Sequence, residues 1–340
     1  MERDAAAEVL DGIPLPAFIV DADERIAAKN AAARGVLSEQ PIGRKLALAL
    51  RAPDLLSAVA EVLAEGGRRE VPLRLTDDGQ YRVAVSALEA AGGRRVLCVL
   101  RDITSEAQSE AIRRDFVANV SHELRTPLTA MMGFIETLRG PARDDAAARG
   151  RFLEIMDREA GRMNRLVRDL LHLSRVESEE RVRPRDPVDL SGVLRGAAAT
   201  VRPAAEDKES RIVISGADGA IFVPGDADQL MQVFLNLVEN AVKYGARGQE
   251  VRVSVSRENT SRGPSIRVDV ADTGEGIDPI HLPRLTERFY RVDTHRSRAE
   301  GGTGLGLAIV KHIVNRHRGW LRIDSKRGEG SVFSVILPET

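Results

Sequence analysis

The sequence predicts a multidomain α+β protein in which a helical hairpin lies between two mixed α/β modules. Short apolar runs alternate with turns at the N-terminus, a long apolar seam with helical spacing follows, and strands alternate with amphipathic helices in the C-terminal part. The length of 340 residues suits two or three domains. We expect their limits at residues 1–104, 105–178 and 186–340.

Composition excludes several classes of protein. The 50 Lys and Arg residues balance the 51 Asp and Glu residues, and the net charge of −1 offers no basic field for direct nucleic-acid binding. The single cysteine, Cys98, cannot form an intramolecular disulfide or a cysteine-based zinc site, so we expect a small buried hydrophobic residue. No run approaches the ~18 apolar residues of a transmembrane segment, and no secretory signal is recognisable. We therefore expect a cytoplasmic protein, and any association with a membrane would be through partners.

The first module contains short strands joined by turns and helices. Ala17–Val20 is an apolar run followed by an Asp-Ala-Asp-Glu turn, and Val96–Leu100 is a second apolar run. Between them, Val83 and Val85 have the two-residue period of a strand. This pattern predicts a small α+β module.

A long helical pattern begins near Thr104 and ends at Gly140-Pro141. Its apolar positions step by three or four residues along one seam: Ile112, Phe116, Val120, Leu124, Leu128, Met131, Ile135 and Leu138. A second helix ends in the charged run 177–185 and has a matching face: Phe152, Ile155, Met156, Met163, Leu166, Val167, Leu170 and Leu173. A lone antiparallel hairpin leaves about half of such a stripe exposed. We therefore expect a homodimer in which two hairpins form an antiparallel four-helix bundle.

The C-terminal part alternates strands with helices. Val251–Val255 and Ile266–Val270 have the two-residue period of strands. Residues 226–244 and 305–317 have the period of amphipathic helices. This order predicts an α/β sandwich.

His122 stands out on the first long helix. At ~100° per residue it lies about 200° from the seam residues Val120 and Leu124, which places it on the exposed side. Thr126 lies one turn farther along the same face, and Glu123 is the next position around the helix. An imidazole nitrogen can attack a phosphoryl group when a carboxylate accepts the ring proton or holds the tautomer, and Glu123 is placed to do so. The alternative interpretation is an ordinary surface histidine.

The helix at residues 228–244 has a polar stripe opposite its apolar face. The stripe has spacings of four, four and three residues and consists of Gln232, Asn236, Asn240 and Lys243. The apolar face consists of Leu230, Val233, Phe234, Leu237, Val238, Ala241 and Val242. Asparagine amide oxygens suit Mg²⁺, which also bridges phosphate oxygens, and a lysine offers a positive charge to a phosphate. The alternative interpretation is an ordinary amphipathic helix.

Two glycine-containing runs flank a basic segment. Asp272–Gly276 follows a strand, where the Asp272 carboxylate can accept a hydrogen bond from an adenine amino group, and Gly301–Leu307 precedes a helix. Glycines let backbone amides approach an anion closely, so the two runs together describe a nucleotide site. Their spacing matches neither the dinucleotide-binding pattern nor the P-loop. The segment between them looks like a lid and contains Arg284, Arg288, Phe289, Tyr290, Arg291, Arg296 and Arg298.

These motifs resemble, in the expected order, the boxes of the sensor histidine kinases of two-component systems. Residues 116–128 (FVANVSHELRTPL) resemble the H box. Residues 236–244, 272–276, 289–293 and 302–306 resemble the N, first-glycine, F and second-glycine boxes. The match covers about residues 105–338, and residues 1–104 resemble a PAS domain. The resemblance implies a PAS-like α/β sensor, a dimeric four-helix bundle, and an α/β sandwich ATP-binding domain of the histidine kinase, Hsp90 and gyrase type.

The resemblance also assigns roles to single residues. It implies that His122 accepts a phosphoryl group from Mg-ATP and passes it to an aspartate of a cognate response regulator. Asn240 would be a Mg²⁺ ligand, with Asn236 beside it. Lys243 would contact a phosphate, and Tyr244 and Asp272 would contact the adenine. The remaining nucleotide-binding positions would be Gly274, Gly276, Arg291, Gly302, Gly304 and Gly306. H boxes of the His-Glu-x-x-Thr type, here with Glu123 and Thr126, are associated with enzymes that also dephosphorylate the regulator. Residues 133–138 are most similar to the phosphate-regulon sensor kinases, which implies phosphate-starvation signalling and a phosphate-signalling partner at the PAS-like domain.

Two other functions compete with this one. An ATP-hydrolysing machine, such as a type II topoisomerase or an Hsp90-like chaperone, has a water-activating Glu four residues before the Mg²⁺-binding Asn, where this chain has Asn236. A phosphatase or scaffold without kinase activity is less compatible with the intact glycine runs and the His122-Glu123 pair. We expect the other histidines to serve on the surface or in packing: His172, His281, His295, His312 and His317.

Overall fold

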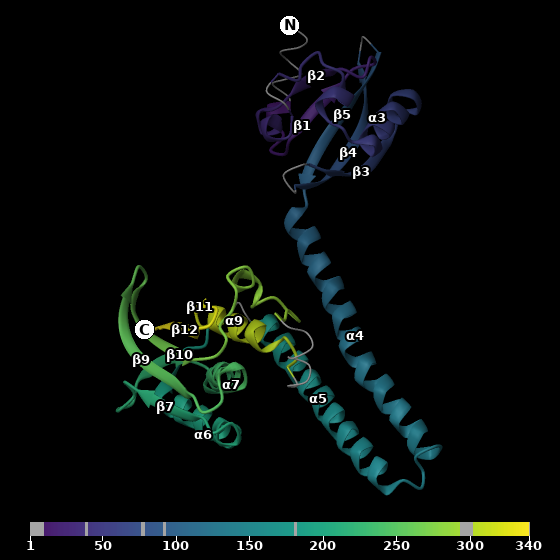
Figure 1. Cartoon of the computed structure of the whole chain (residues 1–340). Helices are drawn as coiled ribbons and strands as arrows, with labels where there is room; N and C mark the ends of the chain where they lie inside the picture. The colour runs from purple at the N-terminus through teal and green to yellow at the C-terminus, as the bar shows by residue number, and fades with distance from the viewer. Residues whose placement is uncertain are drawn as a thin grey trace. The chain divides into compact units, whose positions relative to one another are not determined.

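The computed structural model of the chain describes residues 10–37, 40–75, 79–90, 93–179, 182–292 and 302–339. It divides into two compact units, Met1–Ala118 and Asn119–Thr340 (Figure 1). Within the described residues, no helix combines the length and the apolar character needed to cross a membrane.

The first unit is built on a five-stranded antiparallel sheet with the strand order β2-β1-β5-β4-β3. The strands are β1 (Ala17–Val20), β2 (Ile26–Lys29), β3 (Arg68–Arg74), β4 (Gln80–Ala90) and β5 (Gly93–Asp102). Its helical segments are η1 (Ala31–Gly35), α2 (Leu46–Ala49) and α3 (Pro53–Glu65). The strands predicted at Ala17–Val20 and Val96–Leu100 are confirmed, and Val83 and Val85 lie in β4.

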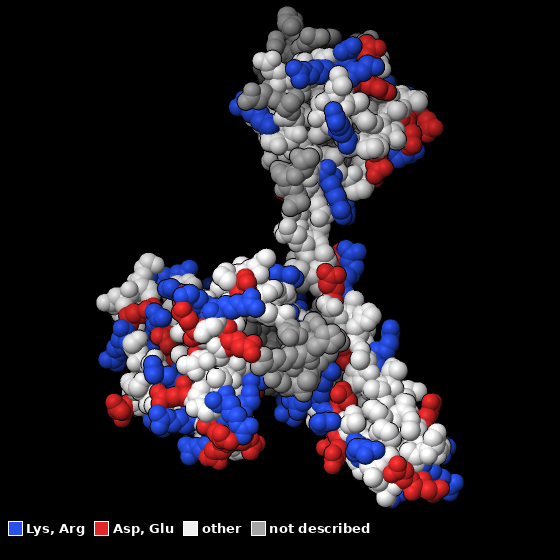
Figure 2. Space-filling model, viewed as in Figure 1, with Lys and Arg blue, Asp and Glu red and all other residues white. Residues whose placement is uncertain are grey.

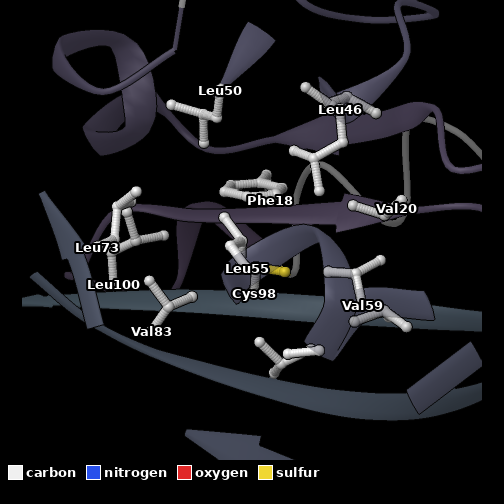
Figure 3. Packing of buried hydrophobic residues seen from close by; sticks show 14 of the residues in the cluster. Phe18, Val20, Leu46, Leu50, Leu55, Val59, Leu73, Val83, Cys98 and Leu100 are labelled. Atoms are coloured by element: carbon white, nitrogen blue, oxygen red, sulfur yellow. The ribbon is translucent and has the colours of Figure 1, made fainter. Parts of the chain in front are cut away.

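The main core of this unit lies between the sheet and α3. Phe18 of β1, Leu55 of α3 and Cys98 of β5 are completely buried and project into one shared space (Figure 3). Burial raises the pKa of the Cys98 thiol to about 12, so this side chain stays protonated and packs as a small hydrophobic residue, as predicted. Both faces of β1 are covered, because Leu10, Ala17 and Ile19 belong to a second buried cluster.

The hairpin consists of α4 (Thr104–Arg139) and α5 (Ala146–Glu179). The Asp102 carboxylate accepts hydrogen bonds from the Thr104 N–H (2.8 Å) and hydroxyl (2.6 Å), so β5 leads directly into α4. Near the turn of the hairpin, the rings of Phe134 and Phe152 stack with their centroids 5.2 Å apart. The predicted pair of long helices is therefore confirmed, and α4 continues through Pro127.

The C-terminal part of the second unit is an α/β sandwich, as predicted. Its main sheet has the order β11-β12-β10-β9-β7, in which only β7 and β9 pair in parallel. The strands are β7 (Arg211–Ser215), β9 (Glu250–Thr260), β10 (Gly263–Asp272), β11 (Trp320–Lys326) and β12 (Gly330–Pro338), with β6 (Asp186–Asp189) and β8 (Phe222–Gly225) in a separate pair. The helices α6 (Leu190–Asp207), α7 (Ala227–Tyr244) and α9 (Gly306–Arg316) pack against one another and the main sheet (Figure 1).

Helix α7 supplies much of this core. The seven apolar residues that the sequence places on one face of α7 are all buried. Helix α7 packs against β9 and β10, whose buried residues include Val253, Ile266 and Val268. On the visible surface of this fold, acidic and basic side chains are intermixed (Figure 2), in agreement with the net charge of −1.

Candidate active site

Helix α7 holds the polar stripe at the centre of the candidate site. Its N-cap, Asp226, accepts hydrogen bonds from the Asp228 and Gln229 N–H groups, both at 3.1 Å, which fixes where the helix begins. The four stripe residues, Gln232, Asn236, Asn240 and Lys243, are each half-buried. One face of α7 is therefore in the core, while the opposite amides and ammonium line a partly covered surface.

The first glycine loop lies against the C-terminal end of α7. Asp272 ends β10, as predicted, and its buried carboxylate accepts a hydrogen bond from the Gly274 N–H at 2.8 Å. Burial raises the pKa of Asp272 above its ordinary value, although this hydrogen bond acts in the opposite direction. A Cβ atom on Gly274 would lie 2.4 Å from the Tyr244 carbonyl oxygen. Only glycine permits this approach of the loop to the helix.

The second glycine loop contacts the middle of α7 and the F segment. The Asn236 side chain donates a hydrogen bond to the Gly306 carbonyl at 3.4 Å, while its own carbonyl accepts one from Gln232 at 3.3 Å. The Phe289 N–H donates to the Gly304 carbonyl at 2.8 Å. Gly304 has a φ of +73°, and a Cβ atom there would lie 2.9 Å from the Phe289 backbone.

The fold thus brings three segments that are distant in sequence, the two glycine loops and the F segment, together with α7. Asn240 and Lys243 lie on α7 between the two glycine loops, and the Lys243 ammonium is 4.7 Å from the centre of the half-exposed Tyr244 ring. Gly276 and Gly302 lie within the same two loops and are half-buried. This arrangement combines a buried carboxylate, two amides, a cation and closely packed glycine backbone, which is a donor and acceptor set suited to a nucleotide with a divalent cation.

The candidate phosphoacceptor lies on the hairpin. His122 is exposed on α4, and the Thr126 hydroxyl donates a hydrogen bond to the His122 carbonyl at 3.1 Å. The Glu123 carboxylate, which the sequence suggests as a partner of the imidazole, accepts a hydrogen bond from the Arg162 guanidinium at 2.5 Å. A nitrogen of Arg291, from the F segment, lies 3.9 Å from the same carboxylate oxygen. In this arrangement Glu123 therefore belongs to an ion-pair cluster that joins α4, α5 and the F segment.

Two further polar contacts join α5 to the second glycine loop and to Arg288, the residue before the F segment. The Thr303 hydroxyl, in the second glycine loop, donates to the Asp169 carboxylate at 2.7 Å. Arg288 donates to the Glu177 carboxylate at 2.6 Å. Burial raises the pKa of Asp169, and the Thr303 hydrogen bond partly offsets this effect. The lid residues Arg296 and Arg298, with His295, lie outside the described residues.

Several residues in these contacts were not predicted. Arg162, Asp169 and Glu177 are three of the many charged residues of α5, and no spacing in the sequence distinguishes them from the others. Gln249, immediately before β9, donates from its side-chain amide to the Ala241 carbonyl and accepts from the Thr273 N–H, both at 2.8 Å. A single glutamine before a strand has no sequence signal that would identify it.

His317 is a packing residue, as predicted. It is completely buried at the end of α9, where its Nδ1 atom is 2.8 Å from the Ile313 carbonyl and its Nε2 atom accepts from the Asp226 N–H at 3.0 Å. These partners require a neutral ring with the proton on Nδ1. Burial lowers the pKa of His317 below its ordinary value.

Comparisons with known proteins match three family models along the chain. Residues 10–108 match the PAS fold, residues 112–179 match the His Kinase A (phospho-acceptor) domain, and residues 225–340 match the histidine kinase-, DNA gyrase B- and HSP90-like ATPases. The sensor-like histidine kinase SenX3 of Mycolicibacterium smegmatis is 41% identical over 272 residues, which are 79% of this chain and 69% of that protein. The chain belongs to the sensor histidine kinase family. Membership of its C-terminal part in the ATPase family implies ATP binding there.

The chain spans only a little more than half the length of some of its relatives. The phosphate regulon sensor protein PhoR of Pseudomonas aeruginosa is 43% identical over 243 residues, or 72% of this chain, but the match spans only 54% of PhoR. The match to SenX3 of Mycobacterium tuberculosis spans 57% of that protein. The solved structure of the histidine kinase ThkA in complex with the response regulator protein TrrA covers 98% of both chains with a TM-score of 0.53 and 20% identity. At 20% identity, this likeness shows that the two chains share a fold and nothing more.

Proposed function

We propose that the chain is an ATP-dependent protein-histidine kinase that phosphorylates its own His122 and transfers the phosphoryl group to an aspartate of a response regulator. One observation carries the proposal. The first-glycine, F and second-glycine segments, which are far apart in sequence, meet at the N segment on α7, in the same chain that presents an exposed histidine on α4.

The residues around α7 suit ATP and Mg²⁺. The Asp272 carboxylate would accept a hydrogen bond from the adenine amino group, and Tyr244 would cover the adenine side. Asn240, with Asn236 beside it, would hold the cation, and Lys243 would contact a phosphate. The bound cation would offset negative charge on the phosphate oxygens. Gly274, Gly276, Arg291, Gly302, Gly304 and Gly306 complete the proposed site.

The chemistry at His122 is a phosphoryl transfer. A ring nitrogen would form a bond to the γ-phosphorus of ATP while the bond from that phosphorus to the bridging oxygen breaks, and ADP would leave. The ring proton would pass to a carboxylate, and Glu123 is adjacent. In this structure the Oε2 atom of Glu123 accepts a hydrogen bond from Arg162.

The proposal extends to partners and signal. Exposed apolar residues on the hairpin, among them Leu128 and Leu171, support a homodimer built through a four-helix bundle. The likeness to PhoR supports phosphate-starvation signalling, with a signalling partner at the PAS domain.

Domain limits at 1–104, 105–178 and 186–340 are supported by the start of α4 at Thr104 and the end of α5 at Glu179. Thr126, one turn from His122, supports an additional phosphatase activity toward the regulator.

A labelling experiment tests the kinase. The purified chain, incubated with Mg²⁺ and ATP labelled on the γ-phosphate, should incorporate an acid-labile, base-stable label. His122→Gln should abolish this label and leave nucleotide binding unchanged, while the control His172→Gln, on α5, should retain it. Wild-type labelling of His122→Gln would refute the assignment of the acceptor. Transfer from the labelled chain to a panel of purified response regulators would then identify the partner by the fastest transfer.

A further inference from the structure

Gln249 connects the two halves of the nucleotide site. Its side chain is only 6% exposed. On one side the side-chain amide donates to the carbonyl of Ala241, the residue that follows Asn240 on α7. On the other side its carbonyl accepts from the Thr273 N–H at 2.8 Å and from the Thr273 hydroxyl at 3.2 Å. Thr273 directly follows Asp272, so each end of this bridge lies next to a proposed ligand-binding residue.

The bridge requires a carboxamide in one orientation. A backbone carbonyl can only accept and a backbone N–H can only donate, so the Ala241 and Thr273 partners fix which end of the Gln249 amide faces each. A carboxylate would place an oxygen against the Ala241 carbonyl, and an apolar side chain would lose both hydrogen bonds. No other side chain of the same length offers a donor and an acceptor at these two positions at neutral pH.

The surrounding backbone is shaped to admit this side chain. A Cβ atom on Gly245 would lie 1.5 Å from the Gln249 side-chain nitrogen, so any larger residue at 245 would displace the amide. The Lys208 ammonium donates to the Lys243 carbonyl at 2.5 Å, and the Gly248 N–H donates to the Lys208 carbonyl at 3.0 Å. Lys208 and Gln249 therefore both hold the last turn of α7. Of these two residues, Gln249 also contacts the first glycine loop.

We propose that Gln249 is a positioning residue for nucleotide binding, which sets the spacing between the metal and phosphate side of the site on α7 and the adenine side at Asp272. The inference rests on the proposed ATP site. It predicts that loss of the bridge weakens nucleotide binding more than it weakens the fold, because a relaxed loop must be ordered again each time a nucleotide binds.

The test uses the full chain and two substitutions, Gln249→Glu and Gln249→Leu. Equilibrium binding of a fluorescent ATP analogue with Mg²⁺ is measured from pH 5.5 to pH 8, and each Kd is divided by the wild-type Kd at the same pH. At pH 8 Gln249→Glu should bind about tenfold more weakly, because it loses the hydrogen bond to the Ala241 carbonyl, and Gln249→Leu, which loses both hydrogen bonds, should bind at least as weakly. The exposed control Gln108→Glu, on α4, should bind like the wild type throughout.

Only Gln249→Glu should regain nucleotide affinity close to that of the wild type at low pH. The carboxyl group that this substitution introduces can, once protonated, donate to the Ala241 carbonyl and accept from the Thr273 N–H, which restores both hydrogen bonds. Burial would raise the pKa of this carboxyl into the measured range. Gln249→Leu has no group that titrates and should stay weak at every pH. A role in folding alone would instead lower the unfolding temperature and leave the Kd ratio near one for the folded fraction.

The outcomes separate this inference from the proposed function. A wild-type chain that binds no nucleotide would overturn the proposed function itself. If the wild type binds and Gln249→Leu binds equally well, the positioning role is refuted. The same holds if the Kd ratio of Gln249→Glu is independent of pH. If Gln249→Glu fails to fold at pH 8, its Kd at pH 5.5 and that of Gln249→Leu still decide the question.

Discussion

Helix α7 and the hairpin helices are all amphipathic, but they differ in what covers their apolar sides. Every apolar residue of the buried face of α7 is at most 3% exposed. In the hairpin, Leu128 of the α4 seam is 49% exposed, and Leu153 and Leu171, which lie outside the predicted apolar face of α5, are 53% and 65% exposed. The ATP-binding fold therefore completes its core within one chain, whereas the hairpin presents apolar surface of the kind that oligomer interfaces bury.

The same difference applies to the candidate functional residues. Around α7, loops and side chains are held by contacts within the fold, such as Asn236 with Gly306 and Asp272 with Gly274. On α4, His122 is exposed. Changes in α7 should therefore alter stability and nucleotide use, while changes on the hairpin should alter chain association and phosphoryl acceptance.

The largest effect should come from the core of α7. Phe234→Ala removes a completely buried ring, and it should lower the free energy of unfolding of the ATP-binding fold by about 3–5 kcal/mol. Trp320 in β11 is the only tryptophan of the chain, so its fluorescence during urea unfolding reports on this fold alone. The matched hairpin change, Leu171→Ala, should leave that transition unchanged and weaken chain association in sedimentation velocity. Equal losses of stability in both variants would contradict the comparison.

The next effect concerns nucleotide use without loss of the fold. Asn240→Ala should reduce the rate of His122 phosphorylation by about 10²-fold, because one preorganised group at the phosphates is lost. Circular dichroism and the Trp320 unfolding transition should stay as in the wild type. The control Asn315→Ala, on the exposed side of α9, should keep full activity. An Asn240→Ala chain with normal labelling would remove this residue from the site.

Much of the fold could be predicted because it depends on local periodicity. The burial of Leu230, Phe234 and Leu237 follows from helical spacing alone, and the strand that ends at Asp272 follows from alternation. The order of the glycine runs was sufficient to predict a nucleotide site. The roles of single residues there remain predictions.

The contacts between distant segments could not be predicted. Glu123 pairs with Arg162, which is 39 positions away, and Thr303 contacts Asp169 across 134 positions. Such pairs depend on how whole elements pack, and a charged residue on a helix surface has the same local pattern with or without a partner. The sequence suggested His122 as the partner of Glu123 because only neighbouring residues can be related by spacing.

A smaller effect should appear in how the free energy of unfolding of the ATP-binding fold depends on pH. Burial lowers the pKa of His317 in the folded chain, whereas the unfolded chain should titrate near 6.5. The unfolded state therefore binds the proton first, and stability falls as the pH drops below about 6.5, by up to about 1.4 kcal/mol per pH unit from this residue. His317→Gln should be less stable at pH 8 by about 1–3 kcal/mol, since it loses a well-fitted hydrogen-bond pair, and its stability should depend less on pH.

The measurement for His317 is urea unfolding followed by Trp320 fluorescence between pH 5 and pH 8. The control is His281→Gln, since His281 is a half-buried histidine of the same fold whose Nδ1 atom is 2.7 Å from the Tyr290 hydroxyl. That variant retains His317 and should therefore keep the contribution of His317 to the pH dependence of stability. A His317→Gln chain with the wild-type slope would show that other groups cause the acid sensitivity.

The smallest expected effect concerns the hairpin and the dephosphorylation of the regulator. Thr126→Ala should slow dephosphorylation about tenfold, the loss of one hydrogen bond that orients the attacking water, while His122 phosphorylation stays near the wild-type rate. The competing explanation is that Thr126 only suits the backbone before Pro127, since its hydroxyl donates to the His122 carbonyl. Thr137 on the same helix makes the same type of bond, to the Gly133 carbonyl at 2.8 Å, so Thr137→Ala removes an equivalent backbone contact away from His122. If Thr126→Ala dephosphorylates the regulator slowly and Thr137→Ala does so at the wild-type rate, the effect is assigned to the oriented water. If both variants dephosphorylate it at the wild-type rate, only the backbone role remains.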